Sequence, residues 1–384
     1  MKVNQQLLTL FRESSKLQLL VGVAFIVLLP VANAADFGKR IIVTSMAEHD
    51  SNPAMVENDK KPVWIFSLIP QVQLDLKDDL NRWYLDAALL VQRHSNQDEL
   101  VNREDPRVSI GWDRIYESGL FGIKADYQES SARVAELNNT GVFSNKDNNQ
   151  KNKVLSAKWQ HDFAPRWSLL TEGSYTDVSY SATGQLDNYT VGAIKSELGY
   201  KNTEKLSTRI LLGYVLLSPE QNLGDTRVKR VVLGADYQVN EAFSLSSSAG
   251  VHNLSGRQSD TDWEGALKAE YTTEHVSYSA GIARDVTASG VGARKVDTLR
   301  LAGKYNLTER DHIGANYSFD QYKKDAETGV NQLNAQTIGM FYERDISERW
   351  QARISANHKK LDSNVSNAQG DVIGFTLVYD TLNF

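Results

Sequence analysis

Residues Leu206–Leu216, LSTRILLGYVL, alternate between two faces with a period of two. One face is mostly apolar and carries Leu206, Thr208, Ile210, Leu212, Tyr214 and Leu216. The other face carries Ser207, Arg209, Leu211, Gly213 and Val215. A period of two with one apolar face is typical of a half-buried β-strand. The same pattern recurs in residues 298–305 and 350–358, so the sequence predicts an all-β fold.

The alternating stretches recur at a fixed interval along the chain. Five tyrosines mark the end of the first strand in successive units, at intervals of 37, 34, 34 and 37 residues: Tyr200, Tyr237, Tyr271, Tyr305 and Tyr342. A repeat of this length indicates one recurring supersecondary element. Because each unit holds two alternating stretches and one short turn, we expect that element to be a β-hairpin.

The connections between the expected strands alternate in length. Short turns are predicted at residues 77–80, 164–166, 202–205, 240–242, 272–275 and 347–349. Longer loops rich in Asn, Asp, Ser and Gly are predicted near residues 97–105, 137–151, 181–188, 219–226, 255–262, 288–295, 325–334 and 361–371. Outer-membrane barrels have this asymmetry, with short periplasmic turns and long external loops. We expect residues 137–151, the longest polar loop, to form an external lid.

Aromatic residues gather beside the short turns. Trp83, Trp167 and Trp350 each follow an arginine just after such a turn, and the five tyrosines stand just before one. In a membrane barrel these eight residues would form an aromatic girdle at the inner interface. The alternative is the general enrichment of aromatics in strands. That alternative does not explain their position relative to turn length.

The strand count points to a closed barrel. Seventeen strands are expected from Val63 onward, and residues 39–48 supply the ascending partner that the first of them needs, which makes about eighteen, with sixteen as the alternative. Apolar strand faces need a partner, and lipid outside a closed barrel provides one. We therefore predict a transmembrane antiparallel β-barrel with a polar lumen over residues 35–384. A soluble periplasmic solenoid or propeller is the alternative architecture.

The first 34 residues have the features of a cleaved signal peptide. Lys2, Arg12 and Lys16 form a basic region, residues 19–29 an apolar core, and Ala32-Asn33-Ala34 a small-residue cleavage pattern. The apolar run is too short for a retained spanning helix, which needs roughly 20 residues. Removing this segment takes the net charge from −6 to −8. Acidic net charge disfavours nucleic-acid binding, and the absence of cysteine excludes disulfides and thiolate metal sites.

The C-terminus carries an expected assembly signal. Ile373, Phe375, Leu377 and Tyr379 form an apolar face, and the sequence ends on Phe384. A terminal aromatic of this kind is expected to be recognised by the outer-membrane barrel assembly machinery. Phe384 lies on the opposite phase from that apolar face, so a bulge after Tyr379 is expected. The expected location is the outer membrane of a Gram-negative bacterium.

Charged residues on the inward phase are the candidate pore lining. Both signs occur in similar number: Lys124, Asp126, Lys158, Glu172, Arg209, Arg230, Asp236, Glu264, Lys268, Glu270, Arg300, Lys304, Asp320, Glu343, Arg353 and Lys359. Rings of charge can select a polar solute that must bind and also leave. The alternative is that opposite charges only pair across neighbouring strands. No H-E-x-x-H or G-x-S-x-G motif occurs, so no enzyme, metal site or cofactor is expected.

Glycines also occur on the inward phase. They are Gly122, Gly213, Gly234, Gly250, Gly281 and Gly314. Each removes a side chain and would widen the lumen locally. Accommodation of wall curvature is an equal explanation.

One short segment carries a resemblance to a known family. Glu48-His49-Asp50-Ser51-Asn52-Pro53 is similar to the acidic D-x-N-P segment of outer-membrane barrels associated with exopolysaccharide export, the exosortase-associated or VpsM-like group, and residues 63–70 open the next strand in the same way. The resemblance implies a conduit for a secreted polysaccharide that works with a periplasmic export protein. A general or substrate-specific diffusion porin is the first alternative, and a barrel enzyme or adhesin is the second.

Overall fold

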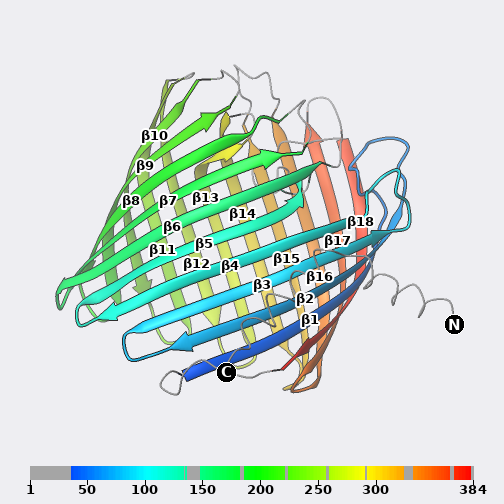
Figure 1. The fold of residues 1–384 in the computed structure, drawn as a ribbon, viewed down its shortest axis with the longest axis horizontal. Helices are drawn as coiled ribbons and strands as arrows, with labels where there is room; N and C mark the ends of the chain where they lie inside the picture. Colours follow the sequence, from blue (N-terminus) through cyan, green and yellow to red (C-terminus); the bar gives the residue numbers. More distant parts are fainter. Residues whose placement is uncertain are drawn as a thin grey trace.

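The chain folds into one closed barrel of eighteen antiparallel strands (Figure 1). The computed structural model describes residues 36–133, 135, 148–181, 186–220, 224–256, 259–289, 292–323, 332–363 and 367–381. The expected signal peptide, residues 1–34, and the expected assembly signal, Phe384, lie outside the described residues. Within the described residues, no helix is long and apolar enough to span a membrane.

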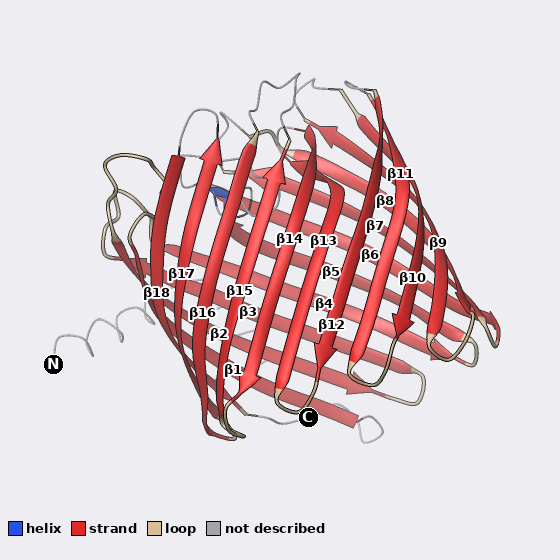
Figure 2. Ribbon diagram, turned by 180° about the vertical axis from the view of Figure 1, so that it is seen from behind, coloured by secondary structure: helices blue, strands red, loops and turns tan. Residues whose placement is uncertain are grey.

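The strands follow one another around the barrel in chain order (Figure 2). They are β1 (Asp36–Asp50), β2 (Val63–Lys77), β3 (Asn81–His94), β4 (Arg103–Tyr116), β5 (Gly119–Ser131), β6 (Asn149–Ala164), β7 (Trp167–Tyr180), β8 (Tyr189–Lys201), β9 (Leu206–Pro219), β10 (Thr226–Gln238), β11 (Phe243–Ser255), β12 (Asp260–Thr272), β13 (Val276–Ser289), β14 (Gly292–Asn306), β15 (Asp311–Tyr322), β16 (Leu333–Ser347), β17 (Trp350–Ser363) and β18 (Asn367–Asp380).

The first and last strands close the barrel. β1 pairs antiparallel with β18 from Ile42 opposite Asp380 to Asp50 opposite Val372. At the end of this seam, Arg40 Nε donates to both carboxylate oxygens of Asp380 at 2.9 Å. Closure pairs every strand with a neighbour on each side, which is what a β-structure in lipid requires. The eighteenth strand predicted near residues 39–48 is therefore confirmed as β1.

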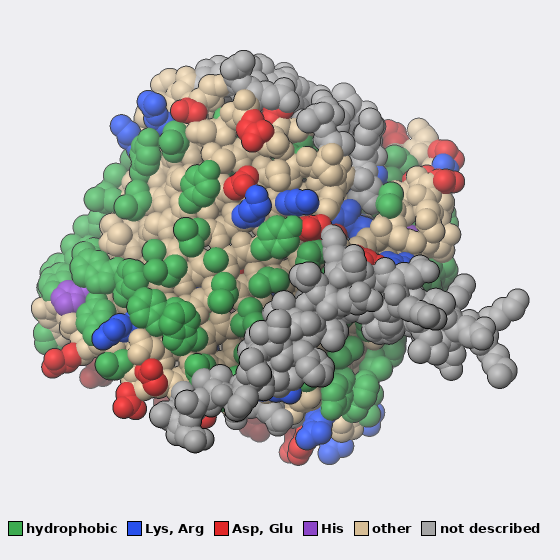
Figure 3. All heavy atoms as spheres, viewed as in Figure 1, with side chains coloured by type: hydrophobic (Ala, Val, Ile, Leu, Met, Phe, Trp, Pro, Cys, Tyr) green, Lys and Arg blue, Asp and Glu red, His purple; other side chains and the backbone are tan. Residues whose placement is uncertain are grey.

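The outer face of the wall is apolar. Exposed hydrophobic side chains occupy every second position of most strands, among them Leu155, Tyr175, Ile194, Leu212, Leu233, Val251, Leu267, Ile282, Ile338, Ile354 and Ile373. Figure 3 shows hydrophobic side chains spread over much of this face, with charged side chains along its lower rim and others in its upper half. A closed barrel with such a face resides in the outer membrane of a Gram-negative bacterium.

The short turns all lie at one end of the barrel, which we call the short-turn end. The six turns predicted from sequence are confirmed within about a residue, and residues 117–118 and 307–310 add two more. In the turns after β6 and β16 a bulge precedes the connection, after Asp162 and after Asp345. Each bulge exposes an apolar residue on the outer face, Phe163 in one and Ile346 in the other.

The aromatic residues predicted for the girdle lie beside these turns. Trp83, Trp167, Tyr237, Tyr271, Tyr305, Tyr342 and Trp350 are exposed, and Tyr200 is partly exposed. Cross-strand ring contacts join neighbouring members: the ring centroids of Trp167 and Tyr200 are 4.5 Å apart, and those of Trp350 and Tyr379 are 4.9 Å apart. The ring of aromatics thus exists as a structural feature. Its placement at a lipid interface stays a prediction.

Two of the loops predicted from sequence are wrong. Residues 288–295 were expected to be a loop, but β13 continues to Ser289 and β14 begins at Gly292. Residues 361–371 were also expected to be a loop, but β17 runs to Ser363 and β18 begins at Asn367. Polar composition was mistaken for loop in both places, because a strand that extends beyond the apolar band needs no apolar face. The end opposite the short turns, the long-loop end, is therefore walled by strand to a greater height than expected.

Candidate functional site

The lumen of the barrel is the candidate site. All sixteen charged residues proposed for it lie on the inward phase of their strands, opposite the exposed apolar side chains. On β6, for example, Lys158 precedes the exposed Trp159, and on β9 Arg209 precedes the exposed Ile210. That these side chains line the path of a solute stays a prediction.

Many of these charges pair with a neighbour of opposite sign. Within the described residues, Nζ or guanidinium nitrogens approach carboxylate oxygens in the pairs Lys124–Asp126 (2.8 Å), Lys158–Asp113 (3.2 Å), Lys268–Glu270 (2.7 Å), Arg300–Asp320 (2.6 Å) and Lys359–Asp50 (2.7 Å). Arg209 pairs with Asp236, and Lys195 with Glu172. Mutual pairing is thus part of what these residues do. Where such a pair is exposed to water, it stabilises a fold by only about 0–1 kcal/mol.

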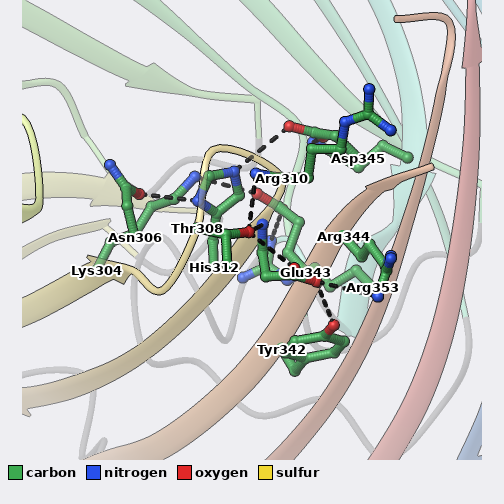
Figure 4. Close-up of polar contacts among 12 residues, drawn as sticks. Lys304, Asn306, Thr308, Arg310, His312, Tyr342, Glu343, Arg344, Asp345 and Arg353 are labelled. Carbon is green, nitrogen blue, oxygen red and sulfur yellow. Dashed lines mark hydrogen bonds and ion pairs between the residues drawn. The ribbon is translucent and has the colours of Figure 1, made fainter. Parts of the chain in front are cut away.

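A polar network occupies the lumen near the short-turn end (Figure 4). Glu343 is nearly buried and lies between Lys304, whose Nζ is 3.1 Å away, and Arg353, whose guanidinium is 4.0 Å away. Arg353 stacks over the ring of Phe341 at 3.7 Å from its centroid. The next residue along β16, Tyr342, is on the outer phase and donates to Asp311 at 2.5 Å. Adjacent residues of β16 therefore point to opposite sides of the wall: Glu343 belongs to the inner charge cluster and Tyr342 to the outer ring of aromatics.

One cavity, of about 590 Å³, lies along the inner wall from β3 to β10. Four basic residues line it, Lys124, Lys158, Lys195 and Arg230, against two acidic residues, Asp113 and Glu172. Leu211, on the inward phase of β9, also lines this cavity, whereas its neighbour Leu212 is exposed on the outer face. The cavity carries an excess of positive charge although the chain as a whole is acidic.

A second cavity, of about 500 Å³, lies toward the long-loop end. It is enclosed by residues of β2 to β5, by residues of β14 to β17, and by the segment that joins β1 to β2. Its charged lining is again mostly basic: Arg103, Arg133, Arg300, Lys359 and Lys360 against Asp50 and Asp320. The sequence interpretation did not include Arg103 or Arg133, because both stand at strand ends where the alternating pattern gives no phase.

The segment that joins β1 to β2 folds back on the barrel wall. Asn52 is fully buried; its Nδ2 donates to the carbonyl of Val56 (2.7 Å) and to that of Gln369 (2.9 Å) on β18. Its Oδ1 accepts from the amide of Val56 at 3.1 Å. Asp50 accepts from the Asn52 amide at 3.0 Å. The Asp50-Ser51-Asn52-Pro53 motif is thus a structural latch that fixes this segment against β18.

Two apolar clusters fill the inner side of the long-loop end. One joins Met55, from the β1–β2 segment, to inward residues of five strands: Val296, Tyr322, Leu333, Leu361 and Ala368. The other joins Ala132, after β5, to Val178, Tyr180, Leu186, Tyr189 and Leu217. The long-loop end therefore combines two apolar clusters with the charged lining of the second cavity, whereas the sequence predicts a polar lumen throughout. Alternation alone did not reveal them, because Leu186, Leu333 and Leu361 stand in stretches whose polar composition predicts loops.

The long-loop ends of β13 and β14 leave the wall and turn inward. Pairing between β12 and β13 stops at Gly265 opposite Arg284, although both strands continue beyond that point. Ala293 on β14 packs against the cluster formed by Ala132 and β7 to β9. Arg230 on β10 reaches Asp285 on β13 at 3.2 Å. The hairpin thus narrows the lumen at the long-loop end.

Titratable groups in this region are not arranged as a metal centre. His252 and Glu264 are both nearly fully buried, and the His252 Nδ1 lies 3.6 Å from a Glu264 carboxylate oxygen. Among the residues that the structure describes, no group of three or more His, Asp or Glu side chains is placed to hold a metal ion.

Comparison with known proteins rests on structure. No protein-family model and no curated protein matches the sequence. Solved outer-membrane porins share the fold: OccAB4 of Acinetobacter baumannii has a TM-score of 0.52 at 10% identity, with 91% of this chain and 98% of that chain covered. The chain has the fold of an outer-membrane porin. OpdK of Pseudomonas aeruginosa, solved with vanillate, has a TM-score of 0.51 at 10% identity, with 91% and 99% covered. OprD of the same organism has a TM-score of 0.50 at 10% identity, with 92% and 97% covered.

Proposed function

We propose that the protein is a selective diffusion porin for small polar solutes, with a preference for anions. The observation that carries this is the pair of cavities on the inner wall, of about 590 and 500 Å³, each with a mostly basic charged lining. Volumes of this size suit a small ligand. Basic residues outnumber acidic ones in the lining of both cavities, so the local potential favours a negatively charged solute.

The export of a polysaccharide, which the family resemblance implies, is supported less well. A polymer needs a continuous bore, whereas Met55 and Tyr322 pack together at one side of the long-loop end and the β13–β14 tip reaches the opposite side. The Asp50-to-Pro53 motif that carried the resemblance has a structural explanation as a latch. Export with a periplasmic partner therefore stays a hypothesis, and so does recognition of Phe384 by the assembly machinery.

Reconstitution of the purified barrel in a planar bilayer tests the proposal. Under a KCl gradient, the reversal potential should show that Cl⁻ permeates more readily than K⁺, and the preference should weaken as ionic strength rises. Liposomes that contain the protein should take up a small carboxylate faster than a neutral sugar of similar size. Absence of conductance, together with loss of surface polysaccharide in a deletion strain, would reject the porin and favour the export conduit.

Charge reversal on the cavity wall sharpens the test. Lys158→Glu combined with Lys195→Glu places two negative charges in the larger cavity and should turn the preference toward K⁺. Lys201→Glu is the matched control, because Lys201 ends β8 at the short turn and is exposed outside both cavities. Equal selectivity in the two variants would show that this cavity does not lie on the path of the ion.

A further inference from the structure

Two neighbouring strands carry the same five-residue pattern on their inward phase. β9 contains Arg209-Ile-Leu-Leu-Gly213, and β10 contains Arg230-Val-Val-Leu-Gly234. The strands are antiparallel, and their register sets Arg209 opposite Gly234 and Gly213 opposite Arg230. Each arginine therefore faces the glycine of the other strand. We call this arrangement the arginine–glycine clasp.

The arginine side chains lie directly over the glycines. A Cβ atom at Gly213 would lie 2.6 Å from Cγ and 2.9 Å from Cδ of Arg230. A Cβ atom at Gly234 would lie 2.7 Å from Nε and 2.9 Å from Cγ of Arg209. Carbon atoms do not approach so closely without a shift. Any residue larger than glycine would force the arginine to change rotamer and to stand away from the wall.

The guanidinium groups at the two ends of the clasp are also held by acidic groups. Arg209 pairs with Asp236 and lies 3.8 Å from Glu197. Arg230 lies 3.6 Å from Glu264 and 3.2 Å from Asp285 on the inward tip of β13. Arg230 also lines the larger cavity. Four residues along a strand span about 13 Å, so the clasp sets two cations at successive heights on one wall.

Glycine opposite a basic residue recurs around the lumen. Register pairs join Lys124 to Gly111, Lys158 to Gly122, Lys268 to Gly281, Lys304 to Gly314 and Lys359 to Gly370. At Gly122 a Cβ atom would lie 2.2 Å from Oδ1 of Asp113 and 2.7 Å from Cε of Lys158, whereas at Gly111, Gly314 and Gly370 it would meet Tyr84, Phe341 and Asn52. Gly250 differs, because there a Cβ atom would meet the backbone oxygen of Val231 at 2.3 Å. Close strand approach thus explains Gly250, whereas room for a basic side chain explains the clasp glycines.

We propose that Gly213 and Gly234 are positioning residues that hold Arg230 and Arg209 flat against the wall as the specificity-determining contacts for the anionic group of a solute. The proposal rests on the proposed function. A guanidinium group fixed in one plane can offer two parallel N–H donors to a carboxylate. With the side chains laid over glycine, the paired guanidinium groups stay partly exposed to the lumen while the bore stays open. Glycine weakens a strand interior. We infer that this cost is offset here by the room that the two glycines give to the arginine side chains.

The test compares conductance with selectivity in planar bilayers. Arg230→Ala should lower anion preference and raise conductance, because it removes both a charge and a side chain. Gly213→Ala should lower anion preference in the same direction but reduce conductance, because the displaced arginine stands into the bore. A role in folding alone would not move the two readouts in this combination. Gly234→Ala should likewise lower both anion preference and conductance, and Arg209→Ala should lower anion preference and raise conductance, at the other arginine of the clasp.

The first control is a glycine that no neighbouring side chain covers. Gly192, on the outer phase of β8, would have nothing within 4 Å of an added Cβ atom, so Gly192→Ala should conduct as the wild type does. In the Arg230→Ala background the added methyl of Gly213→Ala meets no arginine. The double variant should therefore match Arg230→Ala alone, as expected for coupled sites.

The outcomes separate the two proposals. A wild-type barrel that does not conduct rejects the porin itself. A wild-type barrel that conducts with anion preference, beside a Gly213→Ala variant with unchanged selectivity and conductance, rejects the clasp and leaves the porin standing. If Gly213→Ala gives no heat-modifiable barrel, the double variant with Arg230→Ala decides. Recovery of folding in the double variant supports the arginine–glycine clasp, and failure of both Gly213→Ala and the double variant to fold overturns it.

Discussion

The two ends of this barrel finish the same wall in different ways. At the short-turn end, connections of two to four residues join the strands, and Trp83, Tyr305 and Trp350 stand exposed beside them. At the long-loop end, Asn52 latches one segment onto β18 and Tyr322 is buried inside the barrel. Aromatic residues beside the short turns thus face outward, whereas the long-loop end has aromatics on both faces, with Trp64 and Phe66 exposed outside and Tyr322 buried inside. The difference shows that strand alternation fixes the two faces of the wall but not which medium each face meets.

The inward packing has a physical reason. Beyond the apolar band a strand has water on its outer side, so apolar residues there gain by turning toward the interior. Leu217 and Leu333, both nearly fully buried on the inward phase, follow this rule near the long-loop end. The short-turn end lacks chain to cover an apolar interior, and its lumen holds Glu343, Lys304 and Arg353 instead. Loop length therefore decides where the lumen is wet.

The largest expected effect contrasts two tyrosines on neighbouring strands. Tyr322→Ala empties a site that is 2% exposed, in the cluster that also holds Leu333 and Leu361, and should cost about 3–5 kcal/mol of unfolding free energy. Tyr305→Ala removes a ring that is 45% exposed on the outer face and should cost about 1 kcal/mol or less. Urea unfolding in one detergent, followed by tryptophan fluorescence, measures both. Equal losses would show that the ends do not differ in packing.

The next effect contrasts two asparagines. Asn52→Ala removes three hydrogen bonds of a buried amide and should cost about 1–3 kcal/mol. Because the β1–β2 segment is then released and Met55 leaves its cluster, conductance should rise. Asn240→Ala is the control at the other end: its Oδ1 accepts from the amides of Ala242 and Phe243 at 2.9 Å in an exposed turn. That variant should leave conductance unchanged, and a rise in both would contradict a latch specific to Asn52.

The sequence predicted the short-turn end well because its signals are local. Arg166-Trp167 and Arg349-Trp350 stand within a few residues of the turns that they mark, and alternation assigned the phase of Arg209 and Lys158 correctly. The long-loop end depends on partners far apart in the chain. Asn52 bonds to Gln369, 317 residues away, and Ala293 meets the cluster of β7 to β9. No local pattern contains such contacts, so the latch, the inward hairpin and the basic residues Arg103 and Arg133 were missed.

The smallest expected effect separates the ends by pH. In the turn between β2 and β3, Asp78 Oδ1 accepts from the amides of Leu80 (2.9 Å) and Asn81 (2.6 Å), which lowers the pKa of Asp78 below its ordinary 3.8. In the long-loop segment, the Lys61 Nζ lies 2.9 Å from Glu99, and this hydrogen bond raises the pKa of Lys61 above its ordinary 10.5. Both side chains are exposed, so the pKa of each reports on its immediate surroundings only.

The two shifts have opposite signs and so act in opposite pH windows. Because the folded pKa of Asp78 is depressed, its contribution is present above pH 3.8 and is lost as pH falls through the lower folded value. Because the folded pKa of Lys61 is raised, its contribution is present below pH 10.5 and is lost as pH rises through the higher folded value. In an NMR titration the amides of Leu80 and Asn81 should shift only in acid, and the ammonium of Lys61 only in alkali. Glu99→Gln should return the Lys61 midpoint toward 10.5 and leave the Asp78 midpoint unchanged, and a change at both ends would mean that the ends are coupled through the wall.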